Sequence, residues 1–344
     1  MKTVIACISI LFITIFFSIR SIVLPQDKKT LPEENFFNKS LHFTNKGLTY
    51  VYSKENGGLE RLTGIPASEL NCTAARCHVK SCDVCHLRTF DGKSYYSLDP
   101  AKEMDACKNC HSSDQEGPDV HFKKGMKCMD CHSKREIHGD GFEYNSYNEK
   151  GFFDTKCENC HKELTKSVSH TIHNDKLECR VCHTPGFENC FNCHINSRLK
   201  EKKSNKIPVK NVLFLINKDD KVTIANILTY VYNNKTMITV APAYSHSIVK
   251  EGRKCEECHN TQIVSDINDN KFTPVTRESD GFKNIEGIIP VYEILNWNIP
   301  YFNYDNGNWL KIDDPGIPLI NYSYCTPLTK EQFEKLKTEH KSQN

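Results

Sequence analysis

The sequence predicts a mostly α-helical chain with extensive irregular structure and a small antiparallel β element in its C-terminal third. Two observations indicate this fold class. Sixteen of the 18 cysteines lie in short repeated motifs between residues 72 and 259, a density that favours short helices and turns. The apolar fraction is 38% over 344 residues, which is low, so a core made only of side chains is not expected around the motifs.

Residues 207–243 differ from the motif-rich part of the chain. Apolar residues gather there in three runs, separated by an Asp-Asp pair and an Asn-Asn pair. This pattern predicts three antiparallel strands joined by two tight turns. Shorter apolar pieces at 286–294, 297–303 and 317–320 predict strands and extended loops, and a short helix is expected near 329–338.

The first residues are typical of a targeting segment. An almost uncharged apolar run over residues 3–19 follows Lys2, as in a secretory signal peptide. No clear small-x-small cleavage triplet lies between residues 18 and 26, so a retained membrane anchor is the alternative. Either interpretation makes residues 1–24 the signal or anchor and places the remainder in the periplasm or another compartment outside the cytoplasm.

A Cys-x-x-Cys-His motif occurs seven times, and an eighth copy has four residues between its cysteines. The regular copies are Cys82/Cys85/His86, Cys107/Cys110/His111, Cys128/Cys131/His132, Cys157/Cys160/His161, Cys179/Cys182/His183, Cys190/Cys193/His194 and Cys255/Cys258/His259, and the irregular copy is Cys72/Cys77/His78. With 18 cysteines and 15 histidines in the chain, chance would produce about 0.04 copies of the regular motif, the one that marks covalent haem attachment.

The spacing of this motif suits one porphyrin. Two thiols add to the two vinyl groups on one edge of the ring, and the histidine after the second cysteine ligates the iron. Zinc sites do not require a histidine at that position, iron–sulfur runs end in Cys-Pro, and a disulfide framework would not repeat the histidine. The sequence therefore predicts eight haem c groups, or seven if Cys72 and Cys77 form a free or disulfide-bonded pair.

Seven histidines lie outside the motifs, and six of them are predicted to be the second, distal ligands of iron. These six are His42, His121, His138, His170, His173 and His246. His340 lies in a polar C-terminal tail. The sequence leaves open whether it ligates an iron. Eight irons would need eight distal histidines, so at least one iron takes Met104, Met126, Met129, a lysine or water instead. Catalytic residues are not identified by the sequence.

The predicted organisation places a seven-haem domain in residues 25–200 and a β-containing region with the eighth haem in residues 201–344. The haem edges are expected to replace a side-chain core in the first domain. The polypeptide without haem is accordingly predicted to be unfolded, because cofactor binding would stabilise only the native state.

With eight attachment motifs, one of them irregular, the sequence resembles the octahaem cytochromes, the group that includes hydroxylamine oxidoreductases and octahaem tetrathionate reductases. The resemblance covers residues 72–259. It implies a multihaem c-type cytochrome in which one haem differs from the others and can bind substrate.

Two functions follow as hypotheses. The first is electron transfer outside the cytoplasm, between redox partners such as a quinol-oxidising membrane complex or other cytochromes. The alternative is an octahaem oxidoreductase that acts on a small nitrogen or sulfur compound at one haem without a distal histidine. The near-balance of 45 basic and 43 acidic residues gives no indication of a nucleic-acid partner.

Overall fold

The computed structural model describes residues 36–44, 46–66, 68–70, 79–99, 103–111, 117–202, 205–278, 281–293, 295–297 and 299–340. The predicted signal or anchor and the Cys72/Cys77/His78 motif lie outside these residues. No helix in the described ranges is both long and apolar enough to cross a membrane. Helix and strand are nearly equal, at 28% and 26%, so the prediction of a mostly α-helical chain was wrong.

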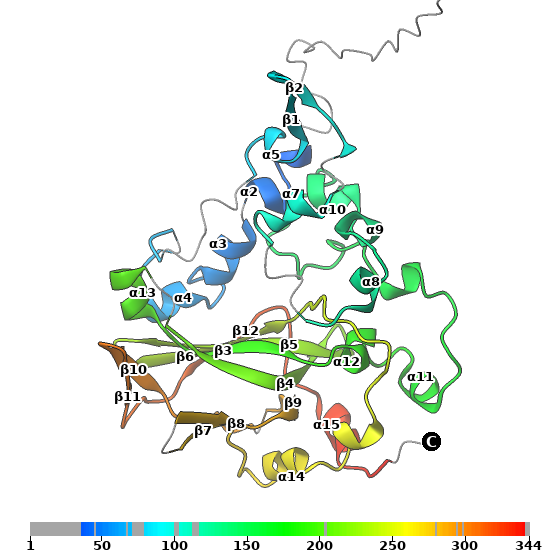
Figure 1. The fold of residues 1–344 in the computed structure, drawn as a ribbon. Helices are drawn as coiled ribbons and strands as arrows, with labels where there is room; N and C mark the ends of the chain where they lie inside the picture. Colours follow the sequence, from blue (N-terminus) through cyan, green and yellow to red (C-terminus); the bar gives the residue numbers. More distant parts are fainter. Residues whose placement is uncertain are drawn as a thin grey trace, which may run out of the picture.

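A six-stranded mixed sheet forms the centre of the molecule, with the strand order β12-β6-β5-β3-β4-β9 (Figure 1). Its strands are β3 (Phe187–His194), β4 (Ile207–Lys218), β5 (Lys221–Tyr232), β6 (Lys235–Pro242), β9 (Gly287–Pro290) and β12 (Leu319–Tyr322). The antiparallel pairing of β4 with β5 and of β5 with β6 confirms the three strands predicted within residues 207–243. Both turns between them have two residues with positive φ, the geometry favoured by tight hairpins.

The remaining three strands explain why the β element is larger than predicted. β9 and β12 join the two edges of the sheet by parallel pairing, and they come from short apolar pieces far along the chain. β4 and β5 pair directly near their shared turn, and β3 lies between them farther out. Because these partners are distant in sequence, local patterns do not reveal them.

Short helices cover one face of the sheet and taper to a hairpin, whereas short strands and helices cover the other face (Figure 1). The first group comprises α2 (Leu41–Thr44), α3 (Lys46–Tyr52), α4 (Leu59–Thr63), α5 (Asp83–His86), the hairpin strands β1 (Leu87–Phe90) and β2 (Lys93–Tyr96), α7 (Met104–Lys108), α8 (Val120–Lys123), α9 (Cys128–Cys131) and α10 (Lys134–His138). Toward one end of the sheet lie η2 (Cys157–Asn159), α11 (Val168–His173) and α12 (Cys179–His183), and α13 (Ile195–Glu201) follows β3. The second group comprises η3 (Cys255–Glu257), α14 (Gln262–Asn268), β7 (Val275–Glu278), β8 (Gly281–Asn284), β10 (Phe302–Asp305), β11 (Asn308–Lys311) and α15 (Lys330–Leu336).

The two parts of the chain bury apolar side chains very differently. In the described residues between 79 and 180, Phe152 is the one buried hydrophobic side chain, while Phe90 is 70% and Leu98 is 67% exposed. Beneath the sheet, by contrast, Ile238, Phe302 and many other apolar side chains form a continuous cluster. The sheet therefore has a conventional core, and the motif-bearing helices need a core of another kind.

Candidate haem-binding sites

Six of the seven regular motifs form a single helical turn. In five of them the backbone N–H of the motif histidine donates to the carbonyl oxygen of the first cysteine, 2.9 Å away. The sixth motif is the whole of α12. Residues three and four apart share one face of a helix, so this turn brings both thiols and the imidazole to the same side. The Cys-x-x-Cys-His spacing thus becomes a compact three-residue group that suits attachment and ligation of one haem.

The second cysteine of a motif can lie outside the helix that carries the first. Helix α7 ends at Lys108, so Cys110 lies in the turn that follows it. The Cys110 backbone N–H donates to the carbonyl oxygen of Cys107 at 3.1 Å, which continues the turn to the second thiol. Cys160 and Cys258 lie just past the ends of η2 and η3 and make the same bond, at 3.2 and 3.1 Å. Cys110 therefore lies beside Cys107 and His111, as the motif predicts, although it is not part of helix α7. Its attachment to haem stays a prediction.

Each of these six motif histidines faces one of the six histidines predicted to be distal ligands. The ring-centre distances are 6.3 Å for His42–His111, 6.0 Å for His86–His138, 6.2 Å for His121–His161, 6.1 Å for His132–His246, 6.2 Å for His170–His183 and 6.2 Å for His173–His259. The angles between the rings range from 27° to 70°, so the six pairs share a distance but not an orientation.

This shared distance fits ligation of one iron by both rings. A metal–nitrogen bond to histidine is about 2 Å long, and each ring centre lies about 1 Å behind its nitrogen, so two ligands on opposite sides are about 6 Å apart. Other ring pairs have similar spacings, such as Phe122–His246 at 6.0 Å. What distinguishes the six pairs is that each joins one motif histidine to one predicted distal histidine. Among the described residues no group of three or more His, Cys, Asp or Glu side chains is placed to hold one metal ion.

Backbone carbonyl oxygens orient several of these rings. An oxygen lies 2.8–3.2 Å from the Nδ1 atom of His86, His170, His173, His183 and His259. An Nδ1–H that donates to a carbonyl leaves Nε2 without a proton and available to a metal. Burial also lowers the pKa of His42 to about 4, which favours the neutral imidazole that binds metals.

His132 has a carboxylate in place of a carbonyl. Its Nδ1 lies 2.6 Å from an oxygen of Glu136, whose side chain is 2% exposed. Sequence reasoning did not select Glu136, although its spacing of four residues from a motif histidine was a usable signal. His340 packs edge-on against His259 with ring centres 4.7 Å apart, and it does not share the spacing of the six pairs.

Thiols of several motifs are near enough to influence one another's pKa. Burial raises the pKa of the Cys107 thiol to about 11, with contributions from the thiols of Cys128 and Cys85. In the same way the pKa of Cys131 is raised by burial and then by Cys160. A hydrogen bond from the Cys179 thiol lowers the pKa of Cys157 to about 7.

The last link of this series joins α12 to η3. Burial raises the pKa of the Cys258 thiol to about 12, and the Cys182 thiol adds to the effect. These thiol interactions link the six sites in the order His86, His111, His132, His161, His183 and His259, with the Cys190/Cys193/His194 motif outside the series.

The Cys190/Cys193/His194 motif has a different structure, because it lies on β3. A bulge sets Cys190 opposite Leu228 and Cys193 opposite Tyr230 on β5, two residues that share one face of a strand. His194 is opposite Val231 and therefore faces the other side. With its thiols and its histidine on opposite faces of a sheet, this motif does not fit a haem held by all three residues.

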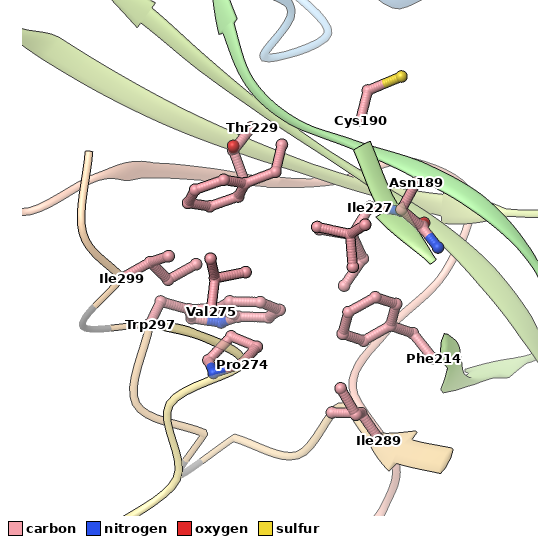
Figure 2. Close-up of a pocket in the computed structure, with 12 residues that line it drawn as sticks. Asn189, Cys190, Phe214, Ile227, Thr229, Pro274, Val275, Ile289, Trp297 and Ile299 are labelled. Carbon is pink, nitrogen blue, oxygen red and sulfur yellow. The ribbon is translucent and has the colours of Figure 1, made fainter. Parts of the chain in front are cut away.

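The surroundings of the motif agree with this separation. The Cys190 sulfur points away from the apolar side chains below β3 (Figure 2), which enclose a cavity of only about 20 Å³ beside Trp297. His194 lines an open polar pocket of about 540 Å³ that neither cysteine lines, and its ring centre is 6.3 Å from that of Tyr304. Its Nδ1 accepts a hydrogen bond from the Ser197 N–H at 3.3 Å, the reverse of the donation made by the paired histidines.

Known proteins provide a limited comparison. No family model and no solved structure matches the chain. A curated protein with similarity is the dissimilatory sulfite reductase MccA of Wolinella succinogenes, which is 30% identical over 90 residues. The match covers 21% of this chain and 12% of that protein, so the chain corresponds to a small part of its length. This partial similarity is consistent with a multihaem cytochrome.

Proposed function

We propose that this chain is a multihaem c-type cytochrome that transfers electrons outside the cytoplasm. The observation that supports it is the series of six sites, each with two thiols on one helical turn and two histidines about 6 Å apart. Sites in such close succession suit transfer from one to the next. A chain that acted on a substrate at every site would not cap each motif histidine with a second histidine.

The residues of this chain have separate tasks in the proposal. The motif cysteines anchor each haem by thioether bonds, the motif histidine ligates iron on one side, and the paired histidine ligates it on the other. The haem supplies reversible one-electron chemistry. The sequence counts eight such groups: six at the paired sites, one at Cys72/Cys77/His78 outside the described residues, and one at Cys190/Cys193/His194, where the fold does not favour it.

The compartment and partners follow as part of the proposal. The apolar segment at the start of the chain is typical of an export signal. Export fits the proposed haem c groups, because exported cytochromes carry covalently attached haem. Electrons would then come from a quinol-oxidising membrane complex or another cytochrome. The redox partner would exchange electrons at an end of the series, near His86 or near His259.

The alternative function is reduction or oxidation of a small sulfur or nitrogen compound. The similarity to a sulfite reductase favours a sulfur oxyanion as the substrate. This chemistry needs an iron with an exchangeable position, and the six histidine pairs do not provide one. Of the two remaining motifs, that of His194 does not fit a haem, so this chemistry would take place at the motif of His78.

Low-temperature electron paramagnetic resonance of the holo-protein, with haem counted by the absorbance of its pyridine complex, separates the two functions. Electron transfer predicts low-spin iron at all six paired sites and no turnover of sulfite, nitrite, hydroxylamine or tetrathionate. A high-spin signal together with turnover of one of these compounds would establish the alternative. If peptides cut from the six paired motifs of the holo-protein were found to carry no haem, both functions would be contradicted.

A further inference from the structure

Glu136 lies in a closed network between two consecutive motifs. One carboxylate oxygen accepts hydrogen bonds from the backbone N–H groups of Asp154 and Thr155 at 2.5 and 2.7 Å, and the other lies 2.6 Å from His132 Nδ1. The Thr155 hydroxyl lies 2.9 Å from the first oxygen and 3.1 Å from the second. The carboxylate is therefore held in one position.

Its charge is stabilised although the side chain is buried. Two backbone N–H groups, the Thr155 hydroxyl and His132 Nδ1 surround the carboxylate at hydrogen-bond distance. A carboxylate is a stronger acceptor than a backbone carbonyl, and an acceptor on Nδ1 makes the imidazole a more basic metal ligand. His86, His183 and His259 have carbonyl oxygens at this position.

The carboxylate at His132 matters because of the place of this site in the series. The His132–His246 pair lies inside the series, while the His86 and His259 sites form its ends. More electron donation from His132 favours the oxidised iron, because hydrogen bonding in the second shell is one of the factors that tune haem potential. An electron that crosses the series must pass this site.

We propose that Glu136 is a positioning residue that sets the reduction potential of the His132–His246 haem below those of the sites at both ends of the series. The inference rests on the proposed function, since it requires haem at these sites. The His132 site then separates two sites, of His86 and His111, from three, of His161, His183 and His259, and electrons equilibrate faster within each group than between the groups. Asp119 approaches His121 less closely, at 3.7 Å, which is beyond hydrogen-bond distance.

The test is a redox titration of the holo-protein followed by optical and paramagnetic resonance spectra. In Glu136→Gln the neutral amide no longer favours the oxidised iron, so one component should move to higher potential while the others stay in place. Glu136→Asp keeps the charge and should restore part of the shift. Glu278→Gln makes the same charge change at a half-exposed carboxylate on the opposite face of the sheet and should move no component.

A second variant keeps the inference testable if Glu136→Gln fails to fold. Thr155→Val removes a hydroxyl that shares the charge of the carboxylate, so the same component should move to lower potential. Unchanged potentials in a variant that retains all its haems would overturn the role of Glu136 and leave the proposed function intact. Absence of haem from the 128–132 peptide of the unmodified protein would overturn the proposed function itself.

Discussion

The motif-bearing helices and the sheet are folded by different means. Between residues 79 and 180 the described chain buries one hydrophobic side chain and exposes ten large ones, such as Phe90 and Phe142. The sheet region has clusters of fully buried aliphatic and aromatic side chains on both of its faces. The comparison indicates that side chains are sufficient for the core of the sheet region, whereas the first region needs another core, which haem edges would supply in the proposed function.

The largest expected effect is on the protein without haem. Produced without haem attachment, the chain should lose structure in residues 79–180 and keep the sheet, because the apolar area buried there is independent of the cofactor. Limited proteolysis with mass spectrometry should show early cleavage in the motif region and a resistant C-terminal fragment, while the holo-protein resists throughout. Equal cleavage of both regions would contradict a self-sufficient sheet and support the sequence-based expectation that the whole apo-chain is unfolded.

The two kinds of motif should differ in haem content. Cys179→Ala/Cys182→Ala disrupts a helical-turn motif and should remove one haem per chain. The matched change on β3, Cys190→Ala/Cys193→Ala, should leave the haem count as it was, because its thiols and His194 are on opposite faces. Absorbance of the pyridine complex and the mass of the intact protein measure both. Loss of a haem from the β3 variant would show that this strand is rearranged in the loaded protein.

Removing one distal histidine is expected to affect one site alone. In His246→Ala the His132 site loses its partner, so one low-spin signal should be replaced by a high-spin signal while the other paired sites keep theirs. His340→Ala is the control, since its ring lies edge-on to His259 outside the pair spacing. A His246→Ala protein with an unchanged spectrum would exclude that histidine as a ligand.

The smallest effect is expected at the contact between β3 and the strands below it. The fully buried Asn192 amide donates to the Phe302 carbonyl and accepts from its N–H, both at 2.8 Å. Asn192→Ala leaves these backbone groups unpaired and should lower the free energy of unfolding of the sheet by about 1–3 kcal/mol. Chemical denaturation measures this, with the more exposed Asn196→Ala as a control. An Asn192→Ala protein as stable as the unmodified protein would show that the Asn192 contacts are not needed.

Sequence patterns predicted the elements whose formation depends on residues close together in the chain. The three strands in residues 207–243 and the helix near residue 330 are confirmed. The six histidines predicted to be distal ligands are the six that face motif histidines, although ligation itself stays a prediction. Their selection was possible because few histidines lie outside the motifs.

Information that depends on distant partners was not accessible in this way. The same five-residue pattern forms a helical turn around Cys179 and a strand around Cys190, because β5 and β4 provide pairing partners only for the second. The sheet was underestimated for the same reason, since β9 and β12 pair with strands that are far away in the chain. The spacing of Glu136 from His132 was a local signal, whereas the contact of Tyr304 with His194 joins residues that are far apart in the chain.

The histidine pairs differ in how far apart their members lie in the sequence. His170 and His183 are near neighbours, whereas His132 pairs with His246 and His173 with His259 across strands β3 to β6. During export, a haem bound at His132 or His173 would therefore gain its second ligand only after the segment that follows β6 had crossed the membrane. Correct assembly of the proposed cytochrome would depend on the late arrival of the two histidines in that segment.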